Sequence, residues 1–364
     1  MKIERLRPSQ LTGDEVAAWN ALLDADSRLD SPFLTPGWAQ AVERAQGGLR
    51  SRDPHDGVQV ALLEDPVGAR GFMAVRLRGP TAMPAGAPMN DYQGLVADPG
   101  LSLDGRRLVE ALEIDRLDFT HMLADQPAFA PYLRGRDRSH GIDIAQGYAA
   151  YVAQRAPETG LIKDLDKRRR KAEREIGPVR FEAFSRSQSA FDKLIVWKRE
   201  LMRETGQTDI FDAGWPIRLL DDLFTARDPD FGAVLFTLSF GDQLVASHLH
   251  LRSRHTIHAW FIGHDREFDR LSPGLLLFQD ILRWMDQTPF SYLDFGPGDY
   301  RFKHQFANTG REIGHGFVGR LSPSTLVRSA EYGVRAAAER LDLGRVSALP
   351  GKAMRRLDLL RGLA

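Results

Sequence analysis

The stretch from Thr256 to Phe306 constrains the fold more than any other, because it combines three elements in a fixed order. Residues alternate in Thr256–Ile262, which predicts a strand with one buried face. Leu275–Met285 is apolar almost all round, which is typical of a helix buried against a sheet. A second strand, Tyr292–Phe295, then ends in a glycine-rich turn. This order predicts a strand, a crossover helix and a second strand on one sheet.

The helix in this stretch begins at Ser272-Pro273-Gly274. Serine is a good N-cap, and proline suits the first helical position because it has no N–H to leave unpaired. Gly274 would let a ligand approach the backbone closely. Free N–H groups and the positive end of the helix dipole suit a phosphate or pyrophosphate. An ordinary, well-capped crossover helix explains the same residues, so both interpretations stand.

Composition sets the broad class. A chain of 364 residues exceeds one comfortable core, so two domains are expected. The 49 basic and 49 acidic residues balance, which argues against a general nucleic-acid binder, and no DNA contact is expected. The absence of cysteine excludes disulfides, thiolate nucleophiles and cysteine metal sites. The polar N-terminus and the lack of an apolar run of about 20 residues predict a soluble, cytoplasmic protein.

The first half has the pattern of a scaffold. Thr12–Glu15 has the spacing of a capping box, and Thr35 precedes a proline as in a second helix start. Two strand-like runs, Val58–Glu64 and Gly71–Arg78, predict a hairpin. The long connection Gly79–Pro99 either lines a site or is an irregular surface loop. No nucleophile and base come together here, so this half is interpreted as scaffold and substrate wall.

A basic helix is predicted where the two halves join, and it ends in the sequence KDLDKRRRKAEREIG at residues 163–177. A solvated helix with internal ion pairs explains it, and so does a dock for a lipid phosphate, a nucleotide or RNA. A membrane-surface helix needs a wider apolar face than this one offers. The function of this helix stays open.

The second half alternates helices with antiparallel strands, an α+β arrangement. His248 and His250 lie two apart on one predicted strand, and His258 lies on the next. A histidine that faces a cleft could act as a general base near neutral pH, although histidines on half-exposed strands are often structural. No third ligand has a suitable spacing for a metal site, so no metal is expected.

The last candidate cluster follows the strand that ends at Gly296. Asp299, Tyr300 and Lys303 would crowd a carboxylate, a phenol and an ammonium around the end of this strand. Such a tyrosine can protonate a leaving group, and such a lysine can hold a phosphate or carboxylate. In the structural alternative, Asp299 caps the next helix and Lys303 is solvated.

Together these motifs resemble the GNAT acyltransferases, specifically the CelD-type family associated with bacterial cellulose and exopolysaccharide synthesis. The resemblance also extends to the Fem-type aminoacyltransferases, which are built from two GNAT-like halves. It covers most of residues 30–310 and rests on PFLTPGW (32–38), the basic helix, RETG (203–206), VASHLHL (245–251), LSPGLLL (271–277) and DFGPGDYRFKHQF (294–306).

The resemblance implies an α+β fold of tandem GNAT-like domains, each a mostly antiparallel mixed sheet flanked by helices. Residues 1–147 would form an N-terminal scaffold domain and residues 148–322 the acyltransferase domain. Residues 323–364 would form a basic, amphipathic helical tail outside the resemblance. The tail suits peripheral contact with the inner face of the membrane, an anionic regulator such as a nucleotide, or packing on the sheet.

The resemblance also implies a chemistry. Acetyl-CoA would be the acyl donor, and the acceptor would be an amine or hydroxyl of a sugar or lipid-linked saccharide in exopolysaccharide or envelope synthesis. Tyr300 would be the general acid, Asp299 or His248 the base, and Lys303 an orienting group. The residues expected to hold the donor are Phe261, Ile262 and Gly263 along the pantetheine arm and Ser272, Pro273, Gly274 and Leu275 at the pyrophosphate.

Two alternatives remain. Fem-like transfer from aminoacyl-tRNA is favoured by the basic helix, and only there is tRNA an expected partner. A degenerate GNAT that binds a ligand without turnover is favoured by Pro273 and Leu275, which stand where the wider GNAT pattern has small residues.

Overall fold

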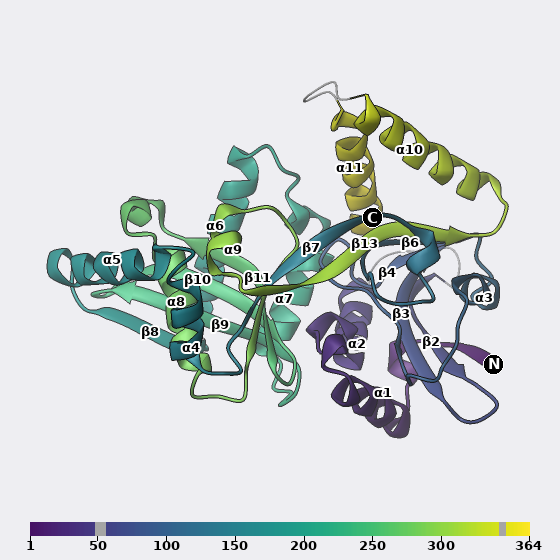
Figure 1. Cartoon of the computed structure of the whole chain (residues 1–364), viewed down its shortest axis with the longest axis horizontal. Coiled ribbons are helices and arrows are strands. Elements are labelled where there is room, and N and C mark those ends of the chain that lie inside the picture. Colours follow the sequence, from purple (N-terminus) through teal and green to yellow (C-terminus); the bar gives the residue numbers. More distant parts are fainter. Residues whose placement is uncertain (48–55, 342–346) are drawn as a thin grey trace.

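The computed structural model describes residues 1–47, 56–341 and 347–364, and its centre is one sheet of thirteen strands (Figure 1). The strands of the first half are β1 (Lys2–Leu6), β2 (Gly57–Glu64), β3 (Arg70–Arg78), β4 (Thr81–Pro84), β5 (Val96–Ala97), β6 (Arg116–Leu123) and β7 (Leu133–Asp143). Those of the second half are β8 (Val179–Ser185), β9 (Gly232–Phe240), β10 (Gln243–Arg252), β11 (Thr256–His264), β12 (Tyr292–Gly296) and β13 (Thr309–Gly319).

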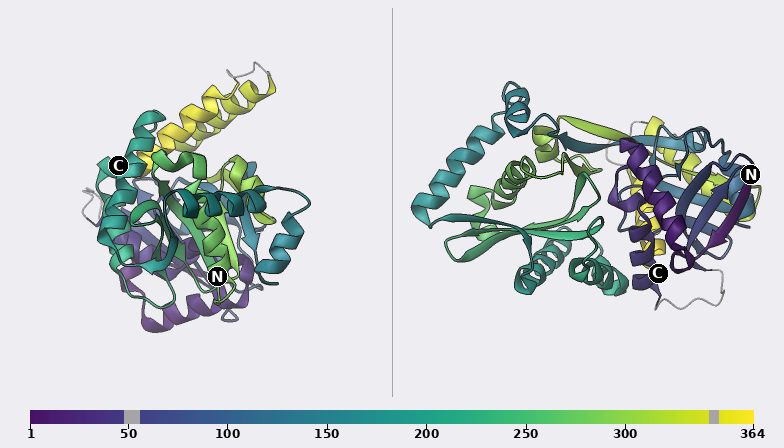
Figure 2. Two further views of the ribbon diagram at one scale, coloured as in Figure 1. Left: turned by 90° about the vertical axis from the view of Figure 1, so that its left-hand side faces the viewer. Right: turned by 90° about the horizontal axis from the view of Figure 1, so that it is seen from below.

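Helices cover both faces of this sheet. They are α1 (Gly13–Ala25), α2 (Pro36–Gln46), α3 (Gly105–Ala111), α4 (Tyr148–Arg155), α5 (Leu161–Glu175), α6 (Gln188–Glu204), α7 (Trp215–Thr225), α8 (Pro273–Met285), α9 (Arg301–Phe306), α10 (Pro323–Arg340) and α11 (Leu349–Leu363). In the second half, α6 and α7 lie under the sheet, and α5 and α8 lie above it (Figure 2). Helices α2 and α7 pack together, so one apolar core continues across both halves.

The strand order is nearly symmetric about the middle of the sheet. It runs β1-β2-β3-β4-β6-β13-β7-β12-β11-β10-β9-β8, with β5 paired to β3. Each half has one parallel pair, β4 with β6 and β11 with β12. The last strand of each half then crosses over: β13 pairs with β6, and β7 pairs with β12. The two crossing strands pair with each other, so neither half completes its sheet alone.

Local sequence explains most helix starts. Thr12 and Glu15 form the predicted capping box: the N–H of Glu15 donates to Thr12 Oγ1 at 3.3 Å, and the N–H of Thr12 donates to Glu15 Oε2 at 2.7 Å. Thr35 caps α2 by accepting from the N–H of Trp38 at 3.1 Å. The hairpin of β2 and β3 and the α+β class are also confirmed, as is the helical C-terminal segment. Among the described helices, none is long and apolar enough to cross a membrane.

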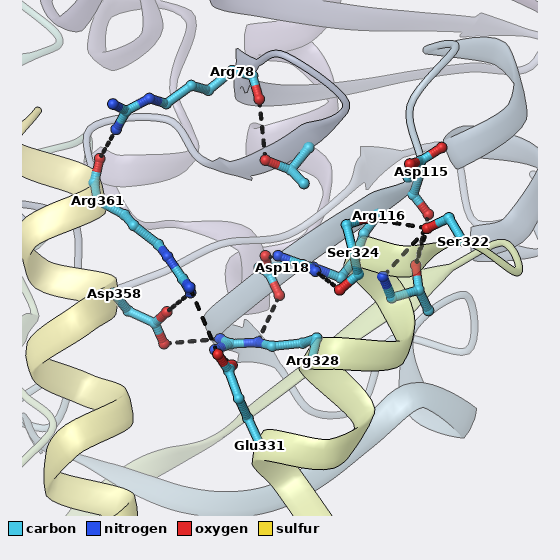
Figure 3. A network of polar contacts seen from close by, with 12 residues as sticks. Arg78, Asp115, Arg116, Asp118, Ser322, Ser324, Arg328, Glu331, Asp358 and Arg361 are labelled. Atoms are coloured by element: carbon cyan, nitrogen blue, oxygen red, sulfur yellow. Dashed lines mark hydrogen bonds and ion pairs between the residues drawn. The ribbon is translucent and has the colours of Figure 1, made fainter.

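The C-terminal helices pack onto the sheet of the first half. Arg328 of α10 is 2% exposed and contacts Asp118 of β6 at 2.9 Å, Glu331 at 2.7 Å and Asp358 of α11 at 2.8 Å (Figure 3). Arg76 of β3 donates to the carbonyl of Gly362 at 2.8 Å. A Cβ on Gly362 would lie 2.6 Å from the carbonyl oxygen of Ala87. The tail is therefore fixed by packing, and its contact with a membrane or nucleotide stays a prediction.

Candidate functional site

Strands β11 and β12 pair over only three positions and then diverge. The pairs are Thr256 with Tyr292, Ile257 with Leu293 and His258 with Asp294, while β11 continues to His264. A bulge marks the point of divergence. His250 pairs with Ala259 and Leu249 with Phe261, so Trp260 is the extra residue. The indole of Trp260 donates to the carbonyl of Met89 at 2.8 Å, which ties the bulge to the first half. Phe261–Gly263 therefore follow the bulge along the splayed part of β11.

Helix α8 begins beside this splay, but not as its sequence predicted. Ser272 has φ 52°, in the left-handed region, and makes no side-chain cap. Its hydroxyl instead contacts the guanidinium of Arg168 from α5. The N–H of Ser272 donates to Asp269 at 3.0 Å, the N–H of Leu275 donates to Ser272 at 3.0 Å, and Pro273 has no N–H. The role of Ser272, Pro273, Gly274 and Leu275 at the pyrophosphate stays a prediction, but Ser272 and Leu275 already use their N–H groups. Of these four residues, only Gly274 has an N–H without a hydrogen bond in the described part of the chain.

Two histidines border Gly274. A Cβ on this residue would lie 3.5 Å from His264 Nδ1 and 3.6 Å from His248 Nε2. His248 is buried under α8, where its ring lies 4.6 Å from that of Phe278. Burial and the neighbouring His250 hold the pKa of His248 well below its usual value. His248 is therefore neutral at pH 7, and such a weakly basic imidazole is poorly matched to general-base work.

The turn after β12 brings Asp299, Tyr300 and Lys303 together, with different surroundings from those predicted. Asp299 pairs with His304 and does not cap α9, whose N-cap is Tyr300. The ring of Tyr300 is 57% exposed. Lys303 is not solvated: it is 6% exposed, and its ammonium donates to the carbonyls of Pro297 and, at 3.1 Å, of Gly296. Lys303 thus stabilises the broken end of β12.

A cluster that the sequence did not predict lies where the two halves meet. We call Asp91, Tyr92, His258, Asp294 and Lys303 the junction cluster. His258 lies between two carboxylates, with Nε2 at 2.9 Å from Asp91 and Nδ1 at 3.5 Å from Asp294. The hydroxyl of Tyr92 donates to Asp294 at 2.7 Å. The N–H of Gly296 also donates to Asp294 at 2.7 Å.

The carboxylates and the histidine of the junction cluster are charged near neutral pH, whereas burial raises the pKa of Tyr92 and keeps its phenol neutral. Burial lowers the pKa of His258, but Asp294 and Asp91 outweigh burial and raise it to about 9. Burial raises the pKa of Asp294, but His258 and Arg311 bring it down to about 2. Burial raises the pKa of Asp91, but the hydrogen bond to His258 and the charge of His258 together lower it below its usual value. Asp91 is 30% exposed, whereas His258 and Asp294 are buried. It is thus the member that can orient an ammonium or hydroxyl group of a substrate.

Little in the sequence could have found this cluster. The segment around Asp91 stood out as a connection that might line a site only because it interrupts a glycine- and proline-rich loop. His258 was considered for catalysis, and Asp294 began the DFGPGDYRFK motif. Nothing local shows that Asp91 and Asp294 both contact His258, because each of the three residues comes from a different segment of the chain.

Comparison with known proteins identifies the fold. Residues 161–304 match the family model described as an acetyltransferase (GNAT) domain. The fold is that of the GNAT acyltransferases. The matched segment begins with α5 and includes the splay of β11 and β12, the start of α8 and Lys303. No curated protein has a similar sequence.

Solved structures share this fold across both halves. FemX, at 9% identity, covers 90% of this chain and 99% of its own length with a TM-score of 0.55. The C-terminal domain of a protein described as a lysylphosphatidylglycerol synthetase from Agrobacterium fabrum, at 10% identity, covers 87% and 95% with a TM-score of 0.51. A conserved protein of unknown function from Bacteroides thetaiotaomicron, at 10% identity, covers 86% and 100% with a TM-score of 0.50. These likenesses concern the fold alone.

Proposed function

We propose that this protein transfers an acyl group from acyl-CoA, with acetyl-CoA as the first candidate, to an amine or hydroxyl of a saccharide. The observation that carries the proposal is the splay of β11 and β12 beside the start of α8. An extended pantetheine arm can lie against the diverging edge at Phe261–Gly263. A phosphate beside Gly274 would meet a free N–H and the positive end of the α8 dipole.

Arg168 offsets the loss of the other amides in this proposal. Its guanidinium contacts the hydroxyl of Ser272, at the turn that leads into α8. A guanidinium can bind two phosphate oxygens at once, and a charge-assisted bond is about twice as strong as a neutral one. The basic helix α5 would thus supply the donor site with charge that the main chain does not provide.

The acceptor would approach Asp91. An ammonium or hydroxyl group held by this carboxylate is oriented for attack on the thioester carbonyl, and orientation alone can lower a barrier by several kcal/mol. Tyr300, exposed on the turn after β12, is the proposed acid toward the departing thiolate. The CelD-type resemblance suggests a sugar or lipid-linked saccharide of exopolysaccharide or envelope synthesis, with the reaction on the cytoplasmic side.

Binding of acetyl-CoA tests the donor. Gly274→Trp fills the space beside His248 and His264, so we expect the thermal stabilisation of the wild type by acetyl-CoA to be lost. Gly333→Trp is the matched control, because Gly333 lies in an exposed turn of α10 with open space around it. If acetyl-CoA raised the melting temperature of both variants equally, acetyl-CoA would not bind at this site. In Tyr300→Phe we expect turnover to fall while acetyl-CoA binding is retained.

Transfer from aminoacyl-tRNA is the second candidate. It is favoured by the occupied amides at the start of α8 and by the outward-facing cations of α5, of which Arg170 and Lys171 are exposed. The fold shared with FemX is compatible with it. Arg170→Glu with Lys171→Glu should abolish tRNA retention on a filter under this candidate and leave acetyl-CoA binding unchanged under the first.

Binding without turnover over a panel of amino sugars would indicate a degenerate enzyme.

A further inference from the structure

A partly open space separates the C-terminal helices from the sheet of the first half. It is a cavity of about 360 Å³ between α10 and α11 on one side and β6, β7 and β13 on the other. Figure 1 shows the two helices above these strands. The volume falls in the range of about 300–1,000 Å³ that small-molecule sites occupy. The network of Arg328 joins both helices to β6, so the cavity is preformed (Figure 3).

One wall of the cavity carries cations that the protein does not neutralise fully. Arg355 of α11 lines the cavity and forms no ion pair in the described part of the chain. Arg335 of α10 donates to Nε2 of His315 at 2.8 Å, and its other contact is the half-exposed Glu339 at 2.8 Å. Burial and Arg335 lower the pKa of His315 to about 4, so its ring is neutral at pH 7 and accepts this bond.

Two of the three carboxylates that line the cavity are already paired with another arginine. Asp118 and Asp358 both belong to the network of Arg328. The third, Asp137, accepts a bond from the N–H of Arg138 at 2.7 Å. Arg335 and Arg355 therefore remain available for a phosphate, which arginine binds through paired N–H donors.

The other wall is polar, and one of its polar atoms lacks a hydrogen-bond partner among the described residues. Asn90 is 3% exposed, and its side-chain N–H donates to the carbonyl of Tyr92 at 3.1 Å. Its Oδ1, however, is buried and has no hydrogen-bond partner among the described residues. A buried acceptor left unpaired costs about 1–3 kcal/mol, so it indicates a missing donor. Thr120 and His121 of β6 line the same wall, and Tyr332 and Met354 supply an apolar side.

We propose that this cavity binds a phosphorylated sugar or polyol. The phosphate would lie on Arg335 and Arg355, and hydroxyl groups would donate to Asn90 Oδ1 and Asp137. Asn90 directly precedes Asp91 of the junction cluster, so the bound molecule would contact the segment that carries the exposed carboxylate. The proposal concerns binding alone and stands whether or not the protein transfers acyl groups from CoA.

Calorimetric titration of the full chain with glucosamine 6-phosphate tests the proposal. We expect binding to weaken about 10-fold or more in Arg355→Ala, because a charge-assisted hydrogen bond is lost. Arg356→Ala removes the same charge from the next residue, which is exposed and does not line the cavity, and should change the affinity by about twofold or less. Arg335→Gln, on the other helix, should weaken binding as Arg355→Ala does. Glucosamine without the phosphate should bind at least about 10-fold more weakly than the phosphate ester.

Three results would overturn the proposal. The wild type could fail to bind glucosamine 6-phosphate, or all variants could bind it equally. Alternatively, vesicles of phosphatidylglycerol in phosphatidylcholine could bind through Arg355 while the soluble ester does not, which would assign the cavity to a lipid headgroup. Since acetyl-CoA is absent from these titrations, failure of the acyl-transfer proposal would not affect them.

Discussion

Gly296 shows how tightly a single residue is constrained at the junction cluster. Its φ is +69°, and a Cβ there would lie 2.7 Å from Oδ2 of Asp91. Gly296→Ala should therefore strain the backbone and displace Asp91, with a loss of about 1–3 kcal/mol in the free energy of unfolding. Urea denaturation measures this loss. Gly100→Ala, where a Cβ meets nothing within 4 Å, is the control, and an equal effect of both changes would contradict the prediction.

The charge of His258 should appear in the pH dependence of stability. Its pKa rises from 6.5 to about 9 on folding, so protonation favours the folded state. This contribution is fully present below pH 6.5 and is lost as the pH rises through 9. The stability difference between wild type and His258→Gln should thus shrink by about 3 kcal/mol between pH 6 and pH 10.

Urea denaturation across this range gives the His258 difference directly. Val196→Ala, a change at an exposed residue that does not titrate, should give a difference that does not vary with pH. A constant His258 difference would mean that folding does not shift the pKa of the imidazole.

For single residues of the candidate site, the sequence predicted some features of the structure and missed others. The turn at Asp299, Tyr300 and Lys303 was located correctly, because a broken strand end has a strong local signature. The surroundings of Lys303 were not, because its carbonyl partners become available only once the chain turns at Gly296. The role of Asp91 was not predicted either, because it depends on a contact with His258, which is distant in the sequence.

At the scale of elements, the buried cation Arg328 helps to hold the tail. Arg328 pairs with three carboxylates, and burial raises the pKa of Asp118 even though Arg328 and Arg116 lower it. Arg328→Met should cost about 3–5 kcal/mol of unfolding free energy, because Asp118 is left buried without its main partner. Guanidinium denaturation measures the loss.

The control for Arg328 is on the same helix. Arg340→Met removes an exposed charge from the last turn of α10 and should change stability by less than about 0.5 kcal/mol. Similar values for the two variants would mean that the ion pairs of Arg328 contribute little to stability.

Elements were predictable where their signals are local. Thr12 and Thr35 cap their helices as expected, since a cap needs only the residues next to it. Ser272 has the same sequence signature and does not cap, because a left-handed turn directs its hydroxyl to Arg168 of another helix. A contact with another helix, which the local sequence does not show, therefore explains why Ser272 differs from Thr12 and Thr35.

At the scale of the whole molecule, the fold depends on an exchange of strands between the halves: β7 pairs with β12, and β13 pairs with β6. No local pattern announces it: each strand sequence is compatible with pairing inside its own half. The α+β class and two GNAT-like halves could therefore be predicted, but not the shared sheet. The boundaries at residues 147 and 322 stay predictions.

The exchange predicts that both halves unfold together. Because β6 needs β13 and β12 needs β7, opening one half exposes the sheet edge of the other. Fluorine NMR of 5-fluorotryptophan-labelled protein in urea can follow Trp38 in the first half and Trp284 in the second. We expect one common midpoint for both signals.

A substitution in the central pair strengthens this test. A Cβ on Gly310 of β13 would lie 2.5 Å from the carbonyl oxygen of Ser139 in β7. Gly310→Ala should therefore lower the midpoints of both tryptophans by the same amount, although each lies in a different half. Separate midpoints in the wild type, or a shift of one signal alone, would show that the halves are independent folding units. The junction cluster would then be a contact between two domains that could open without unfolding.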